Sequence, residues 1–234
     1  MVDKLKIISF DADDTLWINE TYYQEIEKEF INLMSKYRNR DFVTDSIHER
    51  EIDNLEIYGY GAKGFMLSMI ETALYVTNGD VKSDDINRII EMGRGLINKP
   101  IVLLDGVCDV LENVCNAGFK MIVATKGDLL DQERKLRKSG LKEYFDHIEI
   151  MSYKRESDYE KLIAHLGIKP DEFLMIGNSM KSDILPVLNI GGWGIHVPHH
   201  TTWAHELVDN TDGYTNFWEV SNIRQVMEIL EIGF

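Results

Sequence analysis

From Pro100 onward, short apolar segments alternate with helical segments along the chain. Four segments have the apolar or alternating pattern of strands, namely residues 120–125, 145–151, 172–177 and 193–197. Three helical patterns lie before or between them, at residues 106–117, 128–138 and 157–166. This alternation builds β–α–β units, which place parallel strands in one sheet with helices on its faces. The sequence therefore predicts an α/β fold with a doubly wound parallel sheet.

The amino-terminal part of the chain adds one strand and a helical insertion. Residues 5–10 form an apolar run that is typical of a buried parallel strand. From Asn19 to Asn98, apolar side chains instead recur at three- and four-residue steps, in stripes over 23–37, 66–74 and 86–96. We expect a core domain of residues 1–18 and 97–234, interrupted by an inserted α-helical domain of residues 19–96.

The charge of the chain limits its partners. Its 234 residues carry a net charge of −15. Nucleic acids and anionic membranes bind surfaces rich in lysine and arginine, so we expect neither as a partner. The amino-terminal apolar run is short and ends in acidic residues, unlike a secretory leader, and no segment is long enough to cross a bilayer. We expect a cytoplasmic protein, either a monomer or a homodimer.

Two cysteines, Cys108 and Cys115, lie seven positions apart. This spacing matches no common metal-binding pattern and implies no disulfide framework. Because an unpaired cysteine usually packs as a small apolar residue, we expect both to be buried free thiols.

Acidic side chains follow the first predicted strand. Asp11, Asp13 and Asp14 occupy three of the four positions after Phe10. In open α/β sheets, ligands bind outside the carboxyl ends of the strands. Crowded carboxylates repel one another unless a cation or a reacting group lies between them. An acidic turn that caps the next helix is the alternative interpretation, and for Asp14 it is equally good.

Polar residues follow three further predicted strands. Thr125 and Lys126 precede a helix amino terminus, where backbone N–H groups can bind phosphate. Lys154 follows the third strand, and Asn178 and Asp183 follow the fourth and offer oxygen ligands for Mg²⁺. Taken singly, each cluster can also be a helix cap or, for Lys154, a solvated surface lysine.

Together these clusters resemble the motifs of the haloacid dehalogenase superfamily, in its phosphatase branch. That family carries Asp-x-Asp-x-Thr after its first strand, Ser or Thr after the second, Lys before the fourth, and Gly-(Asp/Asn)-x-x-x-x-Asp after the fourth. The corresponding residues here are Asp11–Thr15, Thr125, Lys154 and Gly177–Asp183. The resemblance covers the whole chain and implies a Rossmann-like core, with the insertion as the family's helical cap domain.

The resemblance also implies roles for these residues. Asp11 would be the nucleophile that forms an aspartyl-phosphate, and Asp13 the general acid and base. Thr125 and Lys154 would hold the phosphoryl group. The implied Mg²⁺ ligands are Asp11, the Asp13 carbonyl, Asn178 and Asp183. Many relatives have Asp at the position of Asn178, so we expect somewhat weaker Mg²⁺ binding here.

These features predict a Mg²⁺-dependent phosphatase of a small phosphorylated metabolite. The resemblance implies that true dehalogenases lack Asp13, which favours phosphoryl transfer. A phosphomutase, a phosphonatase using Lys63 as its Schiff-base lysine, and a non-catalytic binding or regulatory protein remain alternatives.

Two segments are candidates for contacts with the substrate. Residues 58–65 contain three glycines and are expected to form a flexible loop in which Tyr60 and Lys63 select the substrate, with Lys126 as a further contact. The second segment carries three histidines, His199, His200 and His205. It is interpreted as a surface loop near the cleft, with a Zn²⁺ site as the alternative.

Overall fold

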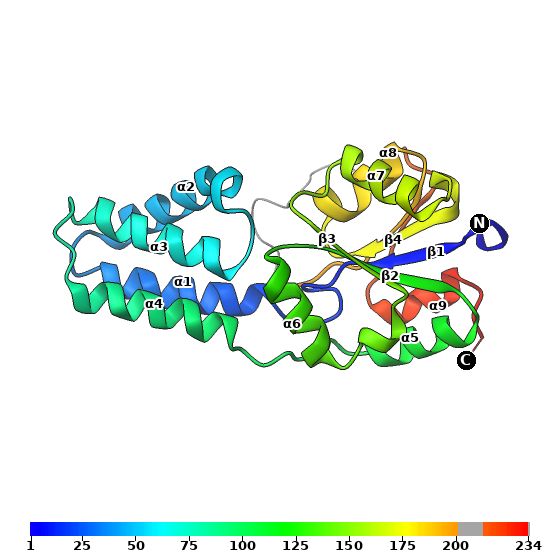
Figure 1. Ribbon diagram of the computed structural model, residues 1–234, viewed down its shortest axis with the longest axis horizontal. Coiled ribbons are helices and arrows are strands. Elements are labelled where there is room, and N and C mark those ends of the chain that lie inside the picture. Colours follow the sequence, from blue (N-terminus) through cyan, green and yellow to red (C-terminus); the bar gives the residue numbers. More distant parts are fainter. Residues whose placement is uncertain (201–212, 234) are drawn as a thin grey trace. The chain divides into compact units, whose positions relative to one another are not determined.

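A computed structural model describes residues 1–200 and 213–233 (Figure 1). The chain divides into two compact units. One unit, here the core unit, contains residues 1–20, 101–126 and those from 132 onward. The other, here the cap unit, contains residues 21–100 together with 127–131.

The core unit is built on a parallel sheet. Within the described residues its six strands lie in the order β3-β2-β1-β4-β5-β6. The strands are β1 (Ile7–Phe10), β2 (Lys120–Lys126), β3 (His147–Met151), β4 (Phe173–Gly177), β5 (Trp193–His196) and β6 (Phe217–Glu219). Every neighbouring pair is parallel, which confirms the predicted doubly wound α/β fold. The short β6 was not predicted, because three partly exposed residues are too few to show the alternation of a strand.

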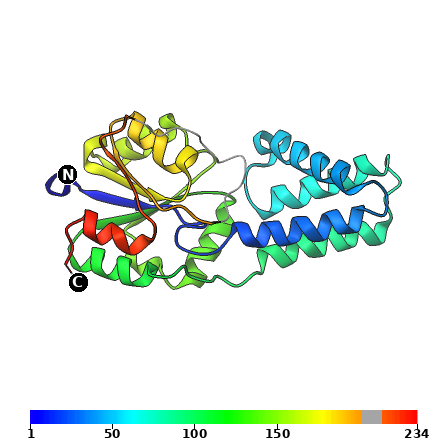
Figure 2. The same ribbon diagram turned by 180° about the vertical axis from the view of Figure 1, so that it is seen from behind.

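Helices cover both faces of this sheet (Figures 1 and 2). The α-helices that belong wholly or mainly to the core unit are α5 (Val107–Asn116), α6 (Leu129–Ser139), α7 (Glu156–Leu166), α8 (Leu185–Asn189) and α9 (Val226–Ile229). Short helical turns lie at Val2–Lys4, Lys142–Tyr144, Pro170–Glu172, Met180–Ile184 and Ile223–Gln225.

Alternate residues of β1 enter different apolar clusters. Ile8 and Phe10 pack in the cluster that contains α5 and α9, whereas Ile7 packs in the cluster that contains α7 and α8. Because successive side chains of a strand point to opposite faces, a central strand covered on both sides must be apolar throughout. This is why β1 could be recognised from its apolar run, which only Ser9 interrupts.

The prediction of buried cysteines was wrong. Cys108 and Cys115 are free, as expected, but both are exposed. Helix α5 buries one stripe, formed by Val107, Val110, Leu111 and Val114. Residues seven apart share a helix face, and this pair lies outside that stripe.

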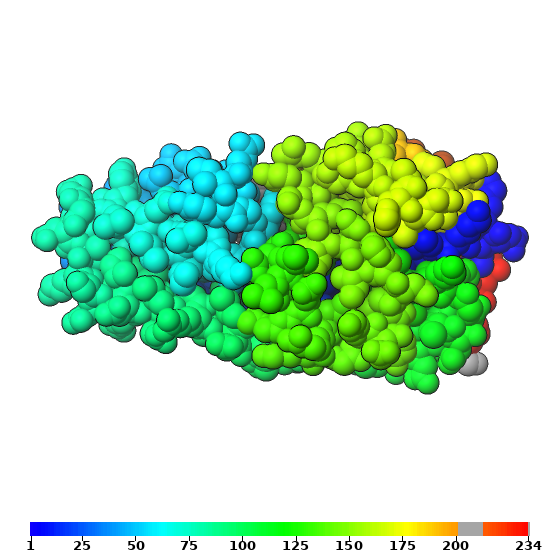
Figure 3. Space-filling view, in the orientation of Figure 1, coloured from blue at the N-terminus to red at the C-terminus, as the bar shows by residue number. Residues whose placement is uncertain are grey.

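The cap unit, all of whose residues are described, is a bundle of four helices. They are α1 (Glu20–Met34), α2 (Arg40–Tyr58), α3 (Ala62–Val76) and α4 (Ser83–Ile97). Their shared core includes Phe30, Ile47, Met69 and Ile89. Residues of α2, α3 and α4 cover the face of this unit that Figure 3 shows. The stripes predicted from the sequence correspond to α1, α3 and α4.

Helix α2 was not predicted as a separate helix. It buries Val43 and Ile47 but exposes Phe42, Ile52 and Ile57, so its apolar residues do not form one stripe. The expected flexible loop over residues 58–65 is also wrong, because only Gly59–Gly61 connect α2 to α3. A Cβ on Gly64 would lie 2.7 Å from the Gly59 carbonyl oxygen. This glycine therefore permits close packing of two helix ends.

The stability of the cap unit should depend on pH through Glu51. Burial, with Glu27 nearby, raises the pKa of this half-buried α2 carboxyl to about 7. The folded state then holds a proton that the unfolded state releases near pH 4.5, so stability falls as pH rises from about 4.5 to about 7. We expect Glu51→Gln to stabilise the protein by about 1–3 kcal/mol at pH 8 and by little at pH 4.

Urea unfolding at the two pH values measures this effect. Glu49→Gln, at an exposed position of the same helix, is the matched control. Equal effects of Glu51→Gln at both pH values would contradict the assignment of the proton to Glu51.

No helix among the described residues is long and apolar enough to cross a membrane.

Candidate active site

The carboxyl ends of β1, β2 and β4 bring the predicted catalytic residues to one edge of the sheet. Phe10 pairs with Val123 of β2 and with Ile176 of β4. Asp11, directly after β1, donates its backbone N–H to the Ile176 carbonyl at 2.8 Å. Thr125 lies near the end of β2, two residues beyond Val123, and Asn178 directly follows β4. Residues more than a hundred positions apart therefore share one small region.

Lys154 lies between two buried carboxylates. Its ammonium nitrogen is 2.5 Å from Asp11 Oδ1 and 2.6 Å from Asp183 Oδ1. The side chain of Lys154 is 1% exposed, so this is not the solvated lysine of the alternative interpretation. Burial alone lowers the pKa of Lys154, but the carboxylates of Asp11 and Asp183 outweigh it and raise that pKa above its ordinary value.

The surroundings of the Asp11 carboxyl disfavour its ionised form. Burial, followed by the charge of Asp183, raises the pKa of Asp11 to about 7, although Lys154 opposes this shift. Two carboxylates face one ammonium, so the cluster carries excess negative charge when both are ionised. A cation at this place would relieve that repulsion.

The side chain of Asn178 lies beside the same carboxylate. Its amide oxygen accepts a hydrogen bond from Thr15 Oγ1 at 3.2 Å, and it faces the Asp13 carbonyl and the Asp11 carboxylate, which can only accept. If the amide is turned by 180°, its nitrogen donates to Asp13 O at 3.2 Å, Thr15 Oγ1 at 3.2 Å and Asp11 Oδ2 at 3.3 Å. Either way, amide, carbonyl and carboxylate groups converge at one point.

This donor set fits Mg²⁺, which binds carboxylate, carbonyl and amide oxygens. Three of the four predicted ligands, Asp11, the Asp13 carbonyl and Asn178, converge. Asp183 pairs instead with Lys154 and accepts from Ser179 N at 3.0 Å. Among the described residues, no three His, Cys, Asp or Glu side chains are grouped to hold a metal.

The side chain of Asp13 is held by residues that sequence reasoning missed. Its carboxylate accepts hydrogen bonds from Trp17 Nε1 at 2.7 Å, Gln132 Nε2 at 2.8 Å and Lys135 Nζ at 2.9 and 3.0 Å. Trp17 lies four residues beyond Asp13, but Gln132 and Lys135 come from α6. One indication of their role was present in the sequence, namely that Gln132 and Lys135 are polar residues of a predicted helix that covers the sheet.

Thr125 and Lys126 occupy the end of β2. Thr125 is 2% exposed, and its hydroxyl makes a long 3.4 Å contact with the Lys126 carbonyl. Lys126 Nζ donates to Ser182 Oγ at 2.7 Å, close in sequence to Asp183. Both residues thus lie at the sheet edge where they were predicted.

Asp14 has a structural task. Its carboxylate accepts the backbone N–H groups of Asn19 at 2.9 Å and Glu20 at 2.8 Å, where α1 begins. The backbone φ of Asp14 is 61°, a left-handed value that turns the chain away from β1. Burial raises the pKa of Asp14 above its ordinary value. These contacts agree with the alternative interpretation, in which Asp14 caps the helix that follows.

The remaining predicted contacts are dispersed. Tyr60 and Lys63 belong to the cap unit, where Lys63 Nζ pairs with Asp128 at 2.9 and 3.0 Å. His199 Nδ1 lies 3.6 Å from Asp14 Oδ1, and its ring contacts that of His200 at 4.2 Å. His205 lies outside the described residues.

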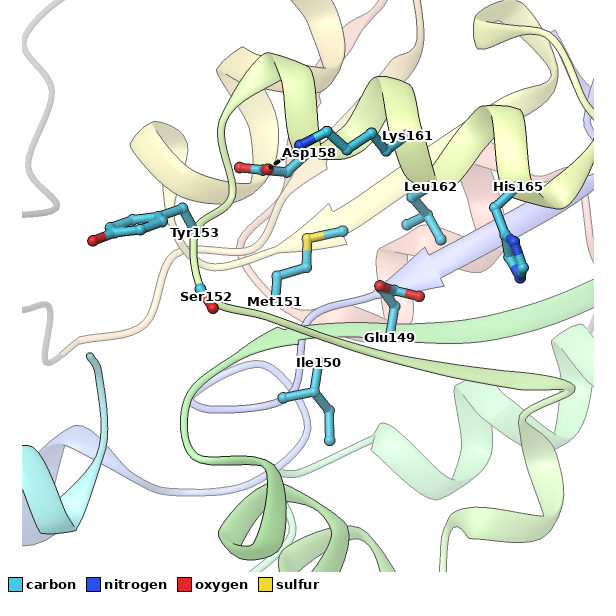
Figure 4. A pocket seen from close by; sticks show the side chains of 9 residues that line it. All are labelled: Glu149, Ile150, Met151, Ser152, Tyr153, Asp158, Lys161, Leu162 and His165. Atoms are coloured by element: carbon cyan, nitrogen blue, oxygen red, sulfur yellow. Dashed lines mark ion pairs between the residues drawn. The ribbon is translucent and has the colours of Figure 1, made fainter. Parts of the chain in front are cut away.

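A separate pocket of about 450 Å³ lies between β3 and α7 (Figure 4). Its lining includes Glu149, Tyr153, Asp158 and Lys161, and Lys161 pairs with Asp158 at 3.6 Å. None of the predicted catalytic side chains lines it, so it is distinct from the cluster around Asp11.

Comparison with known proteins gives a consistent family. A model of haloacid dehalogenase-like hydrolases matches residues 5–191. A haloacid dehalogenase-like family hydrolase from Xanthomonas campestris is 36% identical, with a TM-score of 0.86 over 97% of this chain and 92% of that one.

Two more distant relatives match over their full length. A HAD-hydrolase from Bacillus subtilis, solved bound to magnesium, has 17% identity and a TM-score of 0.65 over 98% of this chain and 100% of that one. The glyceraldehyde 3-phosphate phosphatase of Methanothermobacter thermautotrophicus is 22% identical over 97% of this chain and 100% of its own length.

Proposed function

This chain belongs to the haloacid dehalogenase-like hydrolase family, and on that basis we propose that it is a Mg²⁺-dependent phosphatase of a small phosphorylated metabolite. One observation carries the proposal. The buried Asp11 carboxylate lies against the Lys154 ammonium, and a second carboxylate, Asp13, follows two residues later. A nucleophile, a positive group for the phosphoryl oxygens and an acid–base group therefore share one edge of the sheet.

The chemistry proceeds in two displacements. Asp11 attacks phosphorus, forming an aspartyl-phosphate as the bond to the leaving oxygen breaks. Asp13 gives a proton to that oxygen, so the product departs as an alcohol. Asp13 then takes a proton from a water molecule that attacks the intermediate, which releases phosphate and restores the Asp11 carboxylate. Lys154 offsets the negative charge of the transferring phosphoryl group, and the Thr125 hydroxyl helps to hold that group in place.

The residues that would hold Mg²⁺ are Asp11, the Asp13 carbonyl and Asn178, with Asp183, which pairs with Lys154, contributing directly or through water. When bound, the ion would supply positive charge that offsets the repulsion between the Asp11 carboxylate and an anionic phosphoryl group. The convergence of oxygen groups at Asn178 supports this assignment, as does the magnesium bound in the Bacillus subtilis relative.

Several features favour a phosphatase over the alternatives. Asp13 is present, and three side chains hold its carboxylate in place. Lys63 is half exposed and paired with Asp128, so it lacks the desolvated amine that a phosphonatase lysine needs. The name of the Methanothermobacter relative, a triose-phosphate phosphatase, supports a small phosphorylated substrate.

Phosphate release from p-nitrophenyl phosphate and from a panel of sugar and triose phosphates tests the proposal. We expect activity with Mg²⁺, its loss in excess EDTA and its return with added Mg²⁺. Transfer of phosphate to a sugar without its release would identify a mutase instead. No activity on any ester would favour a non-catalytic binding protein.

The charge of the metal site can be tested separately. Asn178→Asp adds a carboxylate where a neutral amide now faces Asp11 and the Asp13 carbonyl. We expect the Mg²⁺ concentration for half-maximal activity to fall several-fold, because an ionised ligand attracts the cation more strongly. Asn87→Asp, at an exposed position of α4, is the control. An unchanged Mg²⁺ requirement in Asn178→Asp would contradict the placement of Asn178 beside the ion.

A further inference from the structure

The carboxylate of Asp13 is restrained on both of its oxygen atoms. Trp17 Nε1 bonds to Oδ1 at 2.7 Å, and Gln132 Nε2 bonds to Oδ2 at 2.8 Å. Lys135 Nζ bridges the two oxygens at 2.9 and 3.0 Å. Four hydrogen bonds from three side chains fix the plane of the carboxylate as well as its position.

Lys135 is placed for this task rather than for solvation. Its side chain is 12% exposed, although lysine is normally a surface residue. Besides Asp13, its ammonium group bonds to Asn19 Oδ1 at 2.8 Å. If Lys135 releases one oxygen of Asp13 during proton transfer, its ammonium group therefore still has Asn19 as a hydrogen-bond acceptor.

Gln132 shows that the donors are directed at Asp13. Its amide nitrogen bonds both to Asp13 and to the Lys126 carbonyl at 2.7 Å. Its amide oxygen is buried without a hydrogen-bond partner in the part of the chain that the structure describes. An unsatisfied buried acceptor costs free energy. Despite this cost, the packing of α6 keeps the amide nitrogen of Gln132, and not its oxygen, against Asp13.

We propose that Lys135 is the positioning residue for proton transfer by Asp13, and that Gln132 assists it. This inference rests on the proposed phosphatase function. It deepens that function by naming the residues that orient the group that protonates the leaving oxygen. Lys135 does not touch the reacting phosphorus; it acts by holding Asp13 toward the leaving oxygen.

The leaving group of the substrate provides the test. 4-Nitrophenolate is a weak base that leaves without a proton, whereas phenolate benefits from one. The test follows release of the leaving group in a single turnover, before the hydrolysis step that both esters share. For Lys135→Met we expect the rate of this release to fall at least tenfold with phenyl phosphate and less than threefold with p-nitrophenyl phosphate, with KM changing less than twofold for either ester. Asp13→Asn should show the same pattern with larger losses, and Lys135→Arg should regain most of the activity, since a guanidinium can also donate to both oxygens.

Two further variants secure the interpretation. Lys138→Met, at an exposed position of α6, should not change either ester's hydrolysis. If Lys135→Met does not fold, Gln132→Met removes one donor and should show the same dependence on the leaving group, with a smaller loss.

Each alternative outcome is distinct. Equal losses with both esters, or no loss, would refute the positioning role while leaving the phosphatase proposal intact. A wild-type protein that hydrolyses neither these esters nor the metabolite panel would refute the proposed function, and this inference with it.

Discussion

Replacement of Asp11 by asparagine is expected to lower phosphatase activity by at least about a thousandfold, because an amide oxygen is a far weaker nucleophile than a carboxylate. The change is nearly isosteric, so the binding region keeps its shape. Steady-state hydrolysis of p-nitrophenyl phosphate measures the loss, and acid quenching with mass spectrometry measures the aspartyl-phosphate. We expect the wild-type protein to carry the phosphoryl adduct on Asp11 and Asp11→Asn to carry none.

The same substitution should leave the fold intact. Burial and Asp183 raise the pKa of Asp11 to about 7, so the folded protein tolerates a neutral side chain at this position. Lys154 retains Asp183 as its partner at 2.6 Å. Thermal unfolding in EDTA should therefore show no loss of stability at pH 8. Asp53→Asn, at an exposed position of α2, is the control, and appreciable activity in Asp11→Asn would refute the nucleophile assignment.

The second large effect is expected at Lys154. Lys154→Met leaves the carboxylates of Asp11 and Asp183 buried together without their common counter-charge. Removing one partner of a buried ionic group typically costs about 3–5 kcal/mol. We expect a loss of this size in the free energy of urea unfolding at pH 8, together with loss of hydrolysis. The stability loss should shrink toward pH 5, because protonation of one carboxyl removes the repulsion.

A double substitution separates the two roles of Lys154. Lys154→Met with Asp183→Asn removes one negative charge along with the positive one, so we expect stability to recover in large part. Activity should not recover, because no cation remains beside Asp11. Lys161→Met, whose side chain is 78% exposed, is the control for stability. An active, stable Lys154→Met variant would contradict both the electrostatic and the catalytic assignment.

Much of the catalytic cluster could be predicted because its residues directly follow apolar strands. β1 and β4 are covered on both faces and are therefore largely apolar, with Ser9 as the polar residue of β1, and this marks their ends clearly in the sequence. Parallel strands place those ends at one edge, so Asp11, Thr125 and Asn178 could be expected together before any contact was known. The same reasoning did not predict that Lys135 and Gln132 bond to Asp13, or that Lys154 pairs with Asp183.

Local patterns failed where the environment of a side chain depends on another element. Helix α2 carries apolar residues on several sides, so its pattern does not reveal which of them the bundle buries. The exposed cysteines of α5 and the helical position of Lys63 were missed for a related reason. Residue type indicates a preference for burial, but the packing of neighbouring helices decides it.

The sequence alone determined the parallel α/β core, the helical insertion and the strand-end positions of Asp11, Asp13, Thr125, Lys154, Asn178 and Asp183, because strand periodicity and chain order are local properties. Only the tertiary structure decided how their charges are paired. Lys154 lies between Asp11 and Asp183, and Lys135 and Gln132 reach Asp13 from a helix more than a hundred residues away. Hydrogen bonds and ion pairs act over about 3 Å, and only the packing of α6 and the loop after β3 against the sheet brings these atoms within that distance.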